Sequence, residues 1–107
     1  MATADDVTRI ATALEGTMVA PHMDRTAFKV RRIYATLAAD GNTANLKLLP
    51  DEQQLKCLTH PAAFAPVNGG WGQQGWTTLT LTELTPDELE DALKMAWMHG
   101  AAKKPAR

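Results

Sequence analysis

Basic side chains gather in one short stretch of the chain, at Arg25, Lys29, Arg31 and Arg32. Lys47 and Trp76 stand in two later segments where apolar and polar residues also alternate. Cationic side chains neutralise phosphates and release counterions, and an aromatic ring can stack on an unpaired base. If these segments are neighbouring strands, the basic and aromatic residues share one face of a sheet. Such a face has the chemistry to contact nucleic acid.

Each of the five candidate site residues has an expected role. Arg31 and Arg32 are expected to contact phosphates at the corner of a hairpin. Lys29 and Lys47 extend the positive track along the strands, and Trp76 provides a stacking or packing surface. Tyr34 and Thr78 are expected on the same face. A second interpretation stays open, in which the cations only solvate an open sheet and the aromatic rings cover loop ends.

No segment carries a catalytic or metal-binding signature. The chain has no serine, and its three histidines and Cys57 have no recognisable metal-ligand spacing. The glycine-rich segment 68–75 lacks the Lys-Ser/Thr of a phosphate-binding loop and leads into a strand, so we expect a turn whose tryptophan closes the core. We therefore predict a protein that is not an enzyme and has no metal or small-molecule cofactor.

Size and composition predict a single globular domain. The chain has 107 residues, of which 45% are hydrophobic and 21% charged. The domain is expected to span residues 1–107, with 101–107 as a flexible basic tail. A net charge of −1 excludes the strongly basic balance of tight, nonspecific nucleic-acid binders. One cysteine cannot form an internal disulfide, so no oxidising compartment is needed.

The sequence gives no sign of export or of a membrane partner. Its first residues carry two acidic side chains before the first basic one, without the apolar run of a signal peptide. No segment approaches the roughly 20 apolar residues of a membrane span. The expected location is the cytoplasm.

Local patterns place the helices and strands that position these residues. Helix starts are predicted at Thr3 and Thr85, where a threonine precedes an acidic residue by three places. The first helix runs over 4–15 and Gly16 stops it, a second occupies 50–59, and a third begins at Pro86. Residues 17–24 are expected to be irregular. Alternation predicts strands over 28–30, 33–37, 46–48 and 76–82, with an extended piece at 64–67.

These elements predict an α+β fold with two layers, an antiparallel sheet covered on one face by helices. The apolar strand residues are expected to point at the helices: Phe28, Val30, Ile33, Leu37, Leu46, Leu48, Leu79 and Leu81. The other face is left more polar and carries the candidate cations.

Several motifs, in order along residues 5–100, resemble the MmcQ/YjbR family. They are Phe28-Lys29-Val30, Tyr34-Ala35-Thr36-Leu37, Asp40-Gly41, Pro50-Asp51-Glu52-Gln53, Gly70-Trp71-Gly72 and Gly75-Trp76-Thr77. The resemblance implies the order α-β-β-β-α-β-β-α, similar to secretion chaperones and frataxin-like proteins, with no shared catalytic residue. Family members are commonly labelled DNA-binding. The chain differs from many relatives at Arg31-Arg32, where they have Gly-Lys, and at 72–75, where they have basic residues.

Two kinds of partner follow from these observations. The first is DNA, bound by the basic face without catalysis. The alternative is a protein-interaction module that binds another protein or a second copy of itself through the same face, as secretion chaperones do. Affinity for DNA would fall steeply with salt, whereas an apolar protein interface is far less sensitive.

Overall fold

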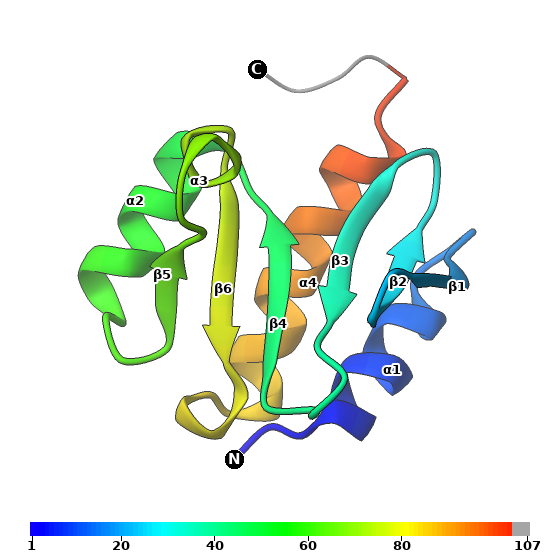
Figure 1. Ribbon diagram of the computed structural model, residues 1–107, viewed down its shortest axis with the longest axis horizontal. Helices are drawn as coiled ribbons and strands as arrows, with labels where there is room; N and C mark the ends of the chain where they lie inside the picture. The colour runs from blue at the N-terminus through cyan, green and yellow to red at the C-terminus, as the bar shows by residue number, and fades with distance from the viewer. Residues whose placement is uncertain (104–107) are drawn as a thin grey trace.

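The computed structural model describes residues 1–103, which form four α-helices, one 3-10 turn and six strands (Figure 1). The helical elements are α1 (Ala4–Ala13), α2 (Pro50–Thr59), α3 (Gly70–Gln73), η1 (Leu81–Glu83) and α4 (Pro86–Ala101). The strands are β1 (Met18–His22), β2 (Arg25–Lys29), β3 (Ile33–Leu37), β4 (Thr43–Lys47), β5 (Phe64–Pro66) and β6 (Trp76–Thr80).

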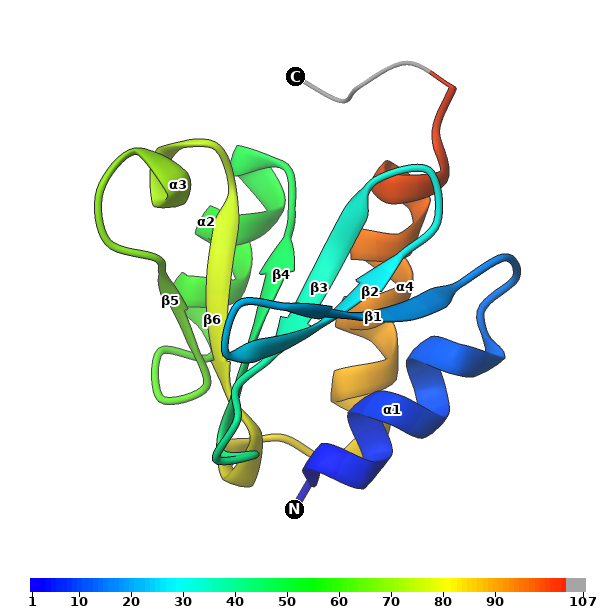
Figure 2. The ribbon, with the colours of Figure 1, turned by 45° about the vertical axis from the view of Figure 1, so that its right-hand side comes forward.

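The strands form one antiparallel sheet in the order β1-β2-β3-β4-β6-β5. Helix α4 packs on β3 and β4, α1 packs on α4, and α2 packs on β5. Figure 2 shows α2 and α4 behind the sheet, with the β1–β2 hairpin crossing in front of it. The predicted two-layer α+β fold is confirmed, with α1, α2 and α4 on one face of the sheet. The opposite face, which only the single turn of α3 borders, is called the helix-free face.

The core lies between the sheet and the helices. Phe28, Leu46 and Leu79 point from the strands toward Leu89 and Leu93 of α4, and all five are fully buried. Complete burial of such a side chain contributes about 1.5–3 kcal/mol. The core therefore fixes the register of the sheet, because a shift by one residue would turn these side chains to the opposite face.

Strand β1 is a correction to the sequence analysis, which predicted irregular chain over 17–24. All five of its side chains are exposed, so no alternation marks it in the sequence. Pro21 is tolerated because β1 is the outermost strand, where a missing N–H costs no ladder bond on the open side. Four strands therefore precede α2, one more than the predicted order contains.

A β-bulge corrects two of the predicted side-chain directions. The register between β2 and β3 shifts, so that Phe28 pairs with Ala35 while Lys29 pairs with Ile33, and Tyr34 is the extra residue. Tyr34 is consequently buried on the helix side, where its hydroxyl lies 2.8 Å from Thr17 Oγ1. Burial raises the pKa of this phenol. Ile33 is turned to the helix-free face. The sequence analysis predicted Ile33 toward the helices and Tyr34 toward the other face, so both predicted directions are wrong.

Both predicted helix starts are confirmed by capping boxes. The Thr3 hydroxyl accepts from the Asp6 N–H, and the Thr3 N–H donates to the Asp6 carboxylate. Thr85 and Glu88 repeat this arrangement at α4. Each such cap contributes about 1 kcal/mol. The helix ends follow local signals less closely, since α1 ends at Ala13, two residues before the predicted position.

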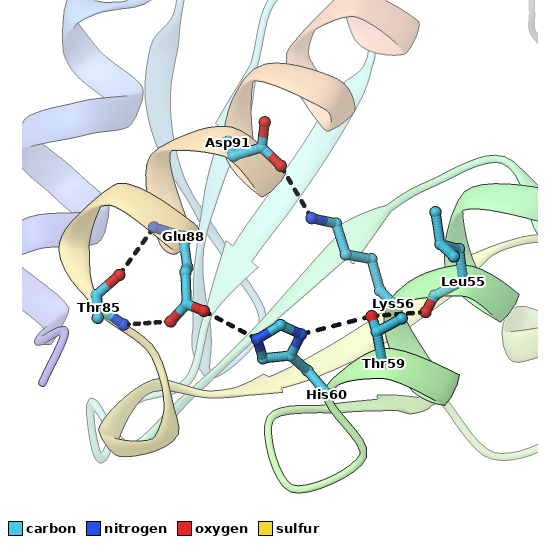
Figure 3. A network of polar contacts seen from close by, with 7 residues as sticks. All are labelled: Leu55, Lys56, Thr59, His60, Thr85, Glu88 and Asp91. Atoms are coloured by element: carbon cyan, nitrogen blue, oxygen red, sulfur yellow. Dashed lines mark hydrogen bonds and ion pairs between the residues drawn. The ribbon is translucent and has the colours of Figure 1, made fainter.

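Polar side chains fasten α2 to α4 on the helix side of the molecule. Figure 3 shows Glu88 joining its capping contact with Thr85 to the ring of His60, whose Nε2 lies 2.9 Å from the carboxylate. Lys56 of α2 donates to Asp91 of α4 over 2.8 Å. The backbone N–H of Thr85, and next His60, lower the pKa of Glu88.

Substituting Glu88 with glutamine is expected to remove part of the acid dependence of stability. A folded-state pKa below the usual ~4.3 means that the ionised carboxylate stabilises the fold above that pH and loses this effect as pH falls. Urea unfolding should therefore show the wild type more stable than Glu88→Gln at pH 7, with the difference closing at pH 3. The exposed Glu83→Gln is the control. A difference that is the same at both pH values would contradict this prediction.

Candidate functional site

A hollow of about 360 Å³ opens on the helix-free face of the sheet. Its floor is made by three neighbouring strands, which supply Ile33 and Thr36 from β3, Asn45 from β4 and Trp76 from β6. Side chains of the same strands that point the other way form the core. The floor is thus set by the alternation of the strands and by the bulge that turns Ile33 outward.

The β1–β2 hairpin forms one wall of the hollow. His22 and Arg25 are the paired residues on either side of its two-residue turn, and both line the hollow. Met23, in the turn, has a φ of 60°, a left-handed conformation that is uncommon for residues other than glycine. The strained turn lies beside the candidate site, and its Met23 side chain is almost fully exposed.

Arg25 is held in place by β3. Its Nε donates to the Thr36 hydroxyl over 2.8 Å, which leaves other N–H groups of the guanidinium for a ligand. On the floor, the Thr78 hydroxyl donates to Asn45 Oδ1 over 2.9 Å and fixes the amide. The site therefore holds preorganised polar groups among aromatic and aliphatic ones.

The glycine-rich segment after β5 forms the opposite wall. Here Trp71 lies in the single-turn helix α3 and is 62% exposed, lining the hollow together with Val67. The prediction that this tryptophan closes the core is therefore wrong. A Cβ at Gly72 would overlap the carbonyl of Val67, so the turn needs glycine at that position to bring Trp71 over the sheet.

Two side chains anchor this wall. Gln53 of α2 donates through Nε2 to the carbonyls of Gly72 and Trp76, both at 3.0 Å. Lys47 of β4, which pairs with Trp76 across the strands, donates to the Gln74 carbonyl. Partial burial lowers the pKa of the Lys47 ammonium.

Charges are distributed unequally between the two sides of the molecule. The ion pairs found within residues 1–103 all involve residues of α1, α2 and α4 or the residue directly after α2. Arg25, Lys29 and Lys47 form none with the described acidic side chains. The cross-strand pairs Lys29–Ile33 and Lys47–Trp76 place two of these cations next to lining residues. The helix-free face thus combines an aromatic hollow with cations that have no carboxylate partner among the residues that the structure describes.

The described residues were also compared with the requirements of a metal site and of a membrane-spanning helix. No group of three or more His, Cys, Asp or Glu side chains within residues 1–103 is arranged to hold a metal ion. None of the helices in this range has the length and apolar content that crossing a bilayer requires.

Comparison with known proteins shows which family the chain belongs to and which solved structure has a similar fold. The family model described as YjbR matches residues 12–99. The chain belongs to the YjbR family. Among solved structures it is similar to the crystal structure of Deinococcus radiodurans protein DR2400, which contains the family-model domain DUF419. The TM-score is 0.81 at 23% identity, over 96% of this chain and 81% of that one, so this likeness shows the fold alone. No curated protein matches the chain.

The five predicted site residues lie in two separate places in the YjbR domain. Lys29, Lys47 and Trp76 lie on the helix-free face, and Trp76 lines the hollow. Arg31 and Arg32 lie instead at the C-terminus of α4. The predicted positive track is therefore interrupted at the hairpin corner.

Arg31 and Arg32 have structural partners in the YjbR domain. Arg32 donates through Nη1 to the His99 carbonyl at 2.9 Å and through Nη2 to the Ala102 carbonyl at 2.7 Å. Arg31 Nε donates to the Ala101 carbonyl at 3.1 Å. Positive charge at the negative end of the helix dipole stabilises α4. The sequence analysis placed Ala101 and Ala102 in a flexible tail, but Ala101 ends α4 and these contacts hold both residues. The predicted tail residues 104–107 lie outside the described residues.

Sequence reasoning missed several lining residues of the YjbR domain: His22, Arg25, Thr36, Asn45 and Trp71. Arg25 belongs to the basic cluster, so its charge was visible in the sequence, whereas the exposure of the Trp71 ring is known only from the structure. Thr36 and Asn45 alternate with apolar residues, as Lys29 does, and the same argument would place them on this face. His22 had no signal, because β1 itself was not predicted.

Proposed function

We propose that this YjbR domain is a noncatalytic, cytoplasmic DNA-binding protein that uses the helix-free face of its sheet. The observation that carries the proposal is the aromatic hollow bordered by Arg25, Lys29 and Lys47, none of which has a carboxylate partner within residues 1–103. Cations whose charge is not paired with a carboxylate are available to phosphates, and tryptophan rings are available to bases. The near-neutral net charge of −1 argues for modest affinity that depends on this local patch.

The two groups of predicted cations have different roles in this proposal. Lys29 is exposed and contacts phosphate directly, whereas Lys47 mainly holds the turn before Trp76. Arg32 stabilises α4, and Arg31 has guanidinium N–H groups beyond its single bond to Ala101. The phosphate contacts therefore centre on Lys29 and Arg25, because Arg31 lies at the C-terminus of α4, outside the helix-free face.

A salt titration of DNA binding tests the proposal. Fluorescence anisotropy with labelled oligonucleotides of mixed sequence, single-stranded and duplex, should show affinity falling linearly with salt on logarithmic axes. Lys29→Ala is expected to reduce the slope by about 0.7 for a single strand and about 0.9 for a duplex, as for one lost phosphate contact. Lys94→Ala, on the helix side and paired with Glu90 at 2.9 Å, is the matched control and should leave the slope unchanged. Absence of binding to either form at low salt would contradict the proposal.

A second candidate function is self-association through β1. This strand lies at the edge of the sheet and exposes all five side chains, Met18 and Val19 among them. An exposed edge can pair with the same strand of a second copy. Sedimentation equilibrium over a hundredfold range of concentration would detect such a dimer, and Val19→Lys should weaken it. A monomer throughout that range would exclude this candidate.

A further inference from the structure

We propose that the hollow on the helix-free face receives one unpaired base, so that the YjbR domain prefers single-stranded DNA to duplex. This inference rests on the proposed function and specifies its substrate. The hollow is formed by Trp71 on one side, Trp76 on the floor and Arg25 on the other side.

The size and lining of the hollow fit a flat aromatic ring. Its volume of about 360 Å³ lies within the ~300–1,000 Å³ in which proteins enclose small organic molecules. Trp71 is largely exposed, and an exposed ring beside a hollow is available for stacking. The guanidinium of Arg25 and the amide of Asn45 offer hydrogen bonds to the edge of a base.

A duplex cannot use this hollow without disruption. Bases in a duplex are paired and stacked, and turning one out has a free-energy cost that lowers affinity. An unpaired base enters without that cost, while its flanking phosphates reach Lys29 and Arg25 at the border of the hollow. Stacking of one base on an aromatic ring raises affinity by about 5- to 150-fold, which favours the single strand by a similar factor.

Alternative ligands of the hollow make different predictions. An isolated nucleotide would bind as tightly as an oligonucleotide if the hollow were a small-molecule site. A strand without bases would bind as tightly as one with bases if only phosphates were recognised. An oligonucleotide that spans the hollow and the surrounding cations should exceed both in affinity.

The experiment compares four probes by anisotropy or competition: a 12-nucleotide thymidine strand, the same length of duplex, an abasic strand of the same length, and thymidine monophosphate. The thymidine strand is expected to bind at least tenfold more tightly than each of the others. Trp71→Ala should lower its affinity by about 5- to 150-fold and change duplex affinity by less than twofold. Trp71→Phe should retain most of the affinity, and Met98→Ala, an exposed apolar residue of α4, should retain all of it.

A fluorescence measurement tests the inference without removing an aromatic ring from the hollow. In the variant Trp71→Phe/Trp97→Phe, Trp76 is the single tryptophan, and the thymidine strand should quench its emission while the duplex should not. Equal binding of single strand and duplex would overturn the inference and leave the proposed function intact. Binding of neither would overturn both, and monophosphate binding as tight as that of the strand would assign the hollow to a small ligand instead.

Discussion

The substitution Gly75→Ala should lower the free energy of unfolding by about 4 kcal/mol or more, a loss that few single substitutions reach. Gly75 has a φ of 104°, and a Cβ at this position would overlap the carbonyl oxygen of Leu48. A hydrogen bond holds these two backbone segments together, since the Leu48 N–H donates to the Gly75 carbonyl over 3.0 Å. The new methyl group therefore cannot be accommodated without separating β6 from the end of β4. Urea unfolding monitored by circular dichroism measures this loss.

Two other glycines separate the backbone strain from the clash. Gly69 has φ and ψ of 79° and −154°, a conformation that is essentially restricted to glycine, and a methyl group added there would meet nothing within 4 Å. Gly69→Ala should therefore cost only the backbone strain of ~1–3 kcal/mol. Gly70 has open space and no positive φ, and Gly70→Ala should change stability very little. If Gly75→Ala cost no more than Gly69→Ala, the close approach to Leu48 would not be present in solution.

Local signals in the sequence predicted the elements that local interactions determine. The capping boxes at Thr3 and Thr85 lie within four residues of chain, and the turn at Gly41, with its φ of 74°, is equally local. The α+β class follows from these elements because each has only one apolar face to bury. Helix α2 was predicted with its bounds, since Pro50 and the acidic residues that follow it mark its start.

The features that escaped prediction depend on contacts between distant segments. At the bulge, Tyr34 packs beside Gly100, where a Cβ would lie 3.0 Å from that of Tyr34, and no pattern within β3 indicates this contact. Alternation alone therefore assigned Ile33 and Tyr34 to the wrong faces. Arg31 and Arg32 could be recognised as basic but not as partners of a helix end some 70 residues away.

The hollow itself is the clearest example of a feature that needs the three-dimensional structure. Its walls come from a hairpin whose first strand has no buried side chain and from a glycine-rich turn, and neither has a periodic pattern. The floor was partly predictable, because Trp76 and Lys47 were placed on the correct face by alternation. Sequence reasoning thus identified a polar face with cations, whereas the structure adds the concave site between them.

The second large effect is expected for Gln53→Glu, which should destabilise the fold by about 3 kcal/mol at pH 7. The Gln53 amide nitrogen contacts only oxygens, the carbonyls of Gly72 and Trp76 and the hydroxyl of Thr77, at 3.0–3.1 Å. A carboxylate has no hydrogen to donate there, so its charge would face the two carbonyl oxygens and leave them without this partner. The wall that carries Trp71 would loosen, and affinity for a single strand should fall together with stability.

The pH dependence of this variant distinguishes the mechanism from a general loss of packing. The neighbouring oxygens raise the folded-state pKa of the introduced carboxyl group above the usual ~4.3 of a glutamate. The loss in free energy of unfolding is therefore present at pH values above ~4.3. It shrinks as the pH falls, because the protonated carboxyl group can donate a hydrogen bond. Unfolding curves of Gln53→Glu and wild type should therefore approach each other between pH 7 and pH 4. Gln54→Glu, the exposed neighbour on α2, should differ little from wild type at either pH. A Gln53→Glu penalty that stays constant with pH would show that the amide does not donate to these oxygens in solution.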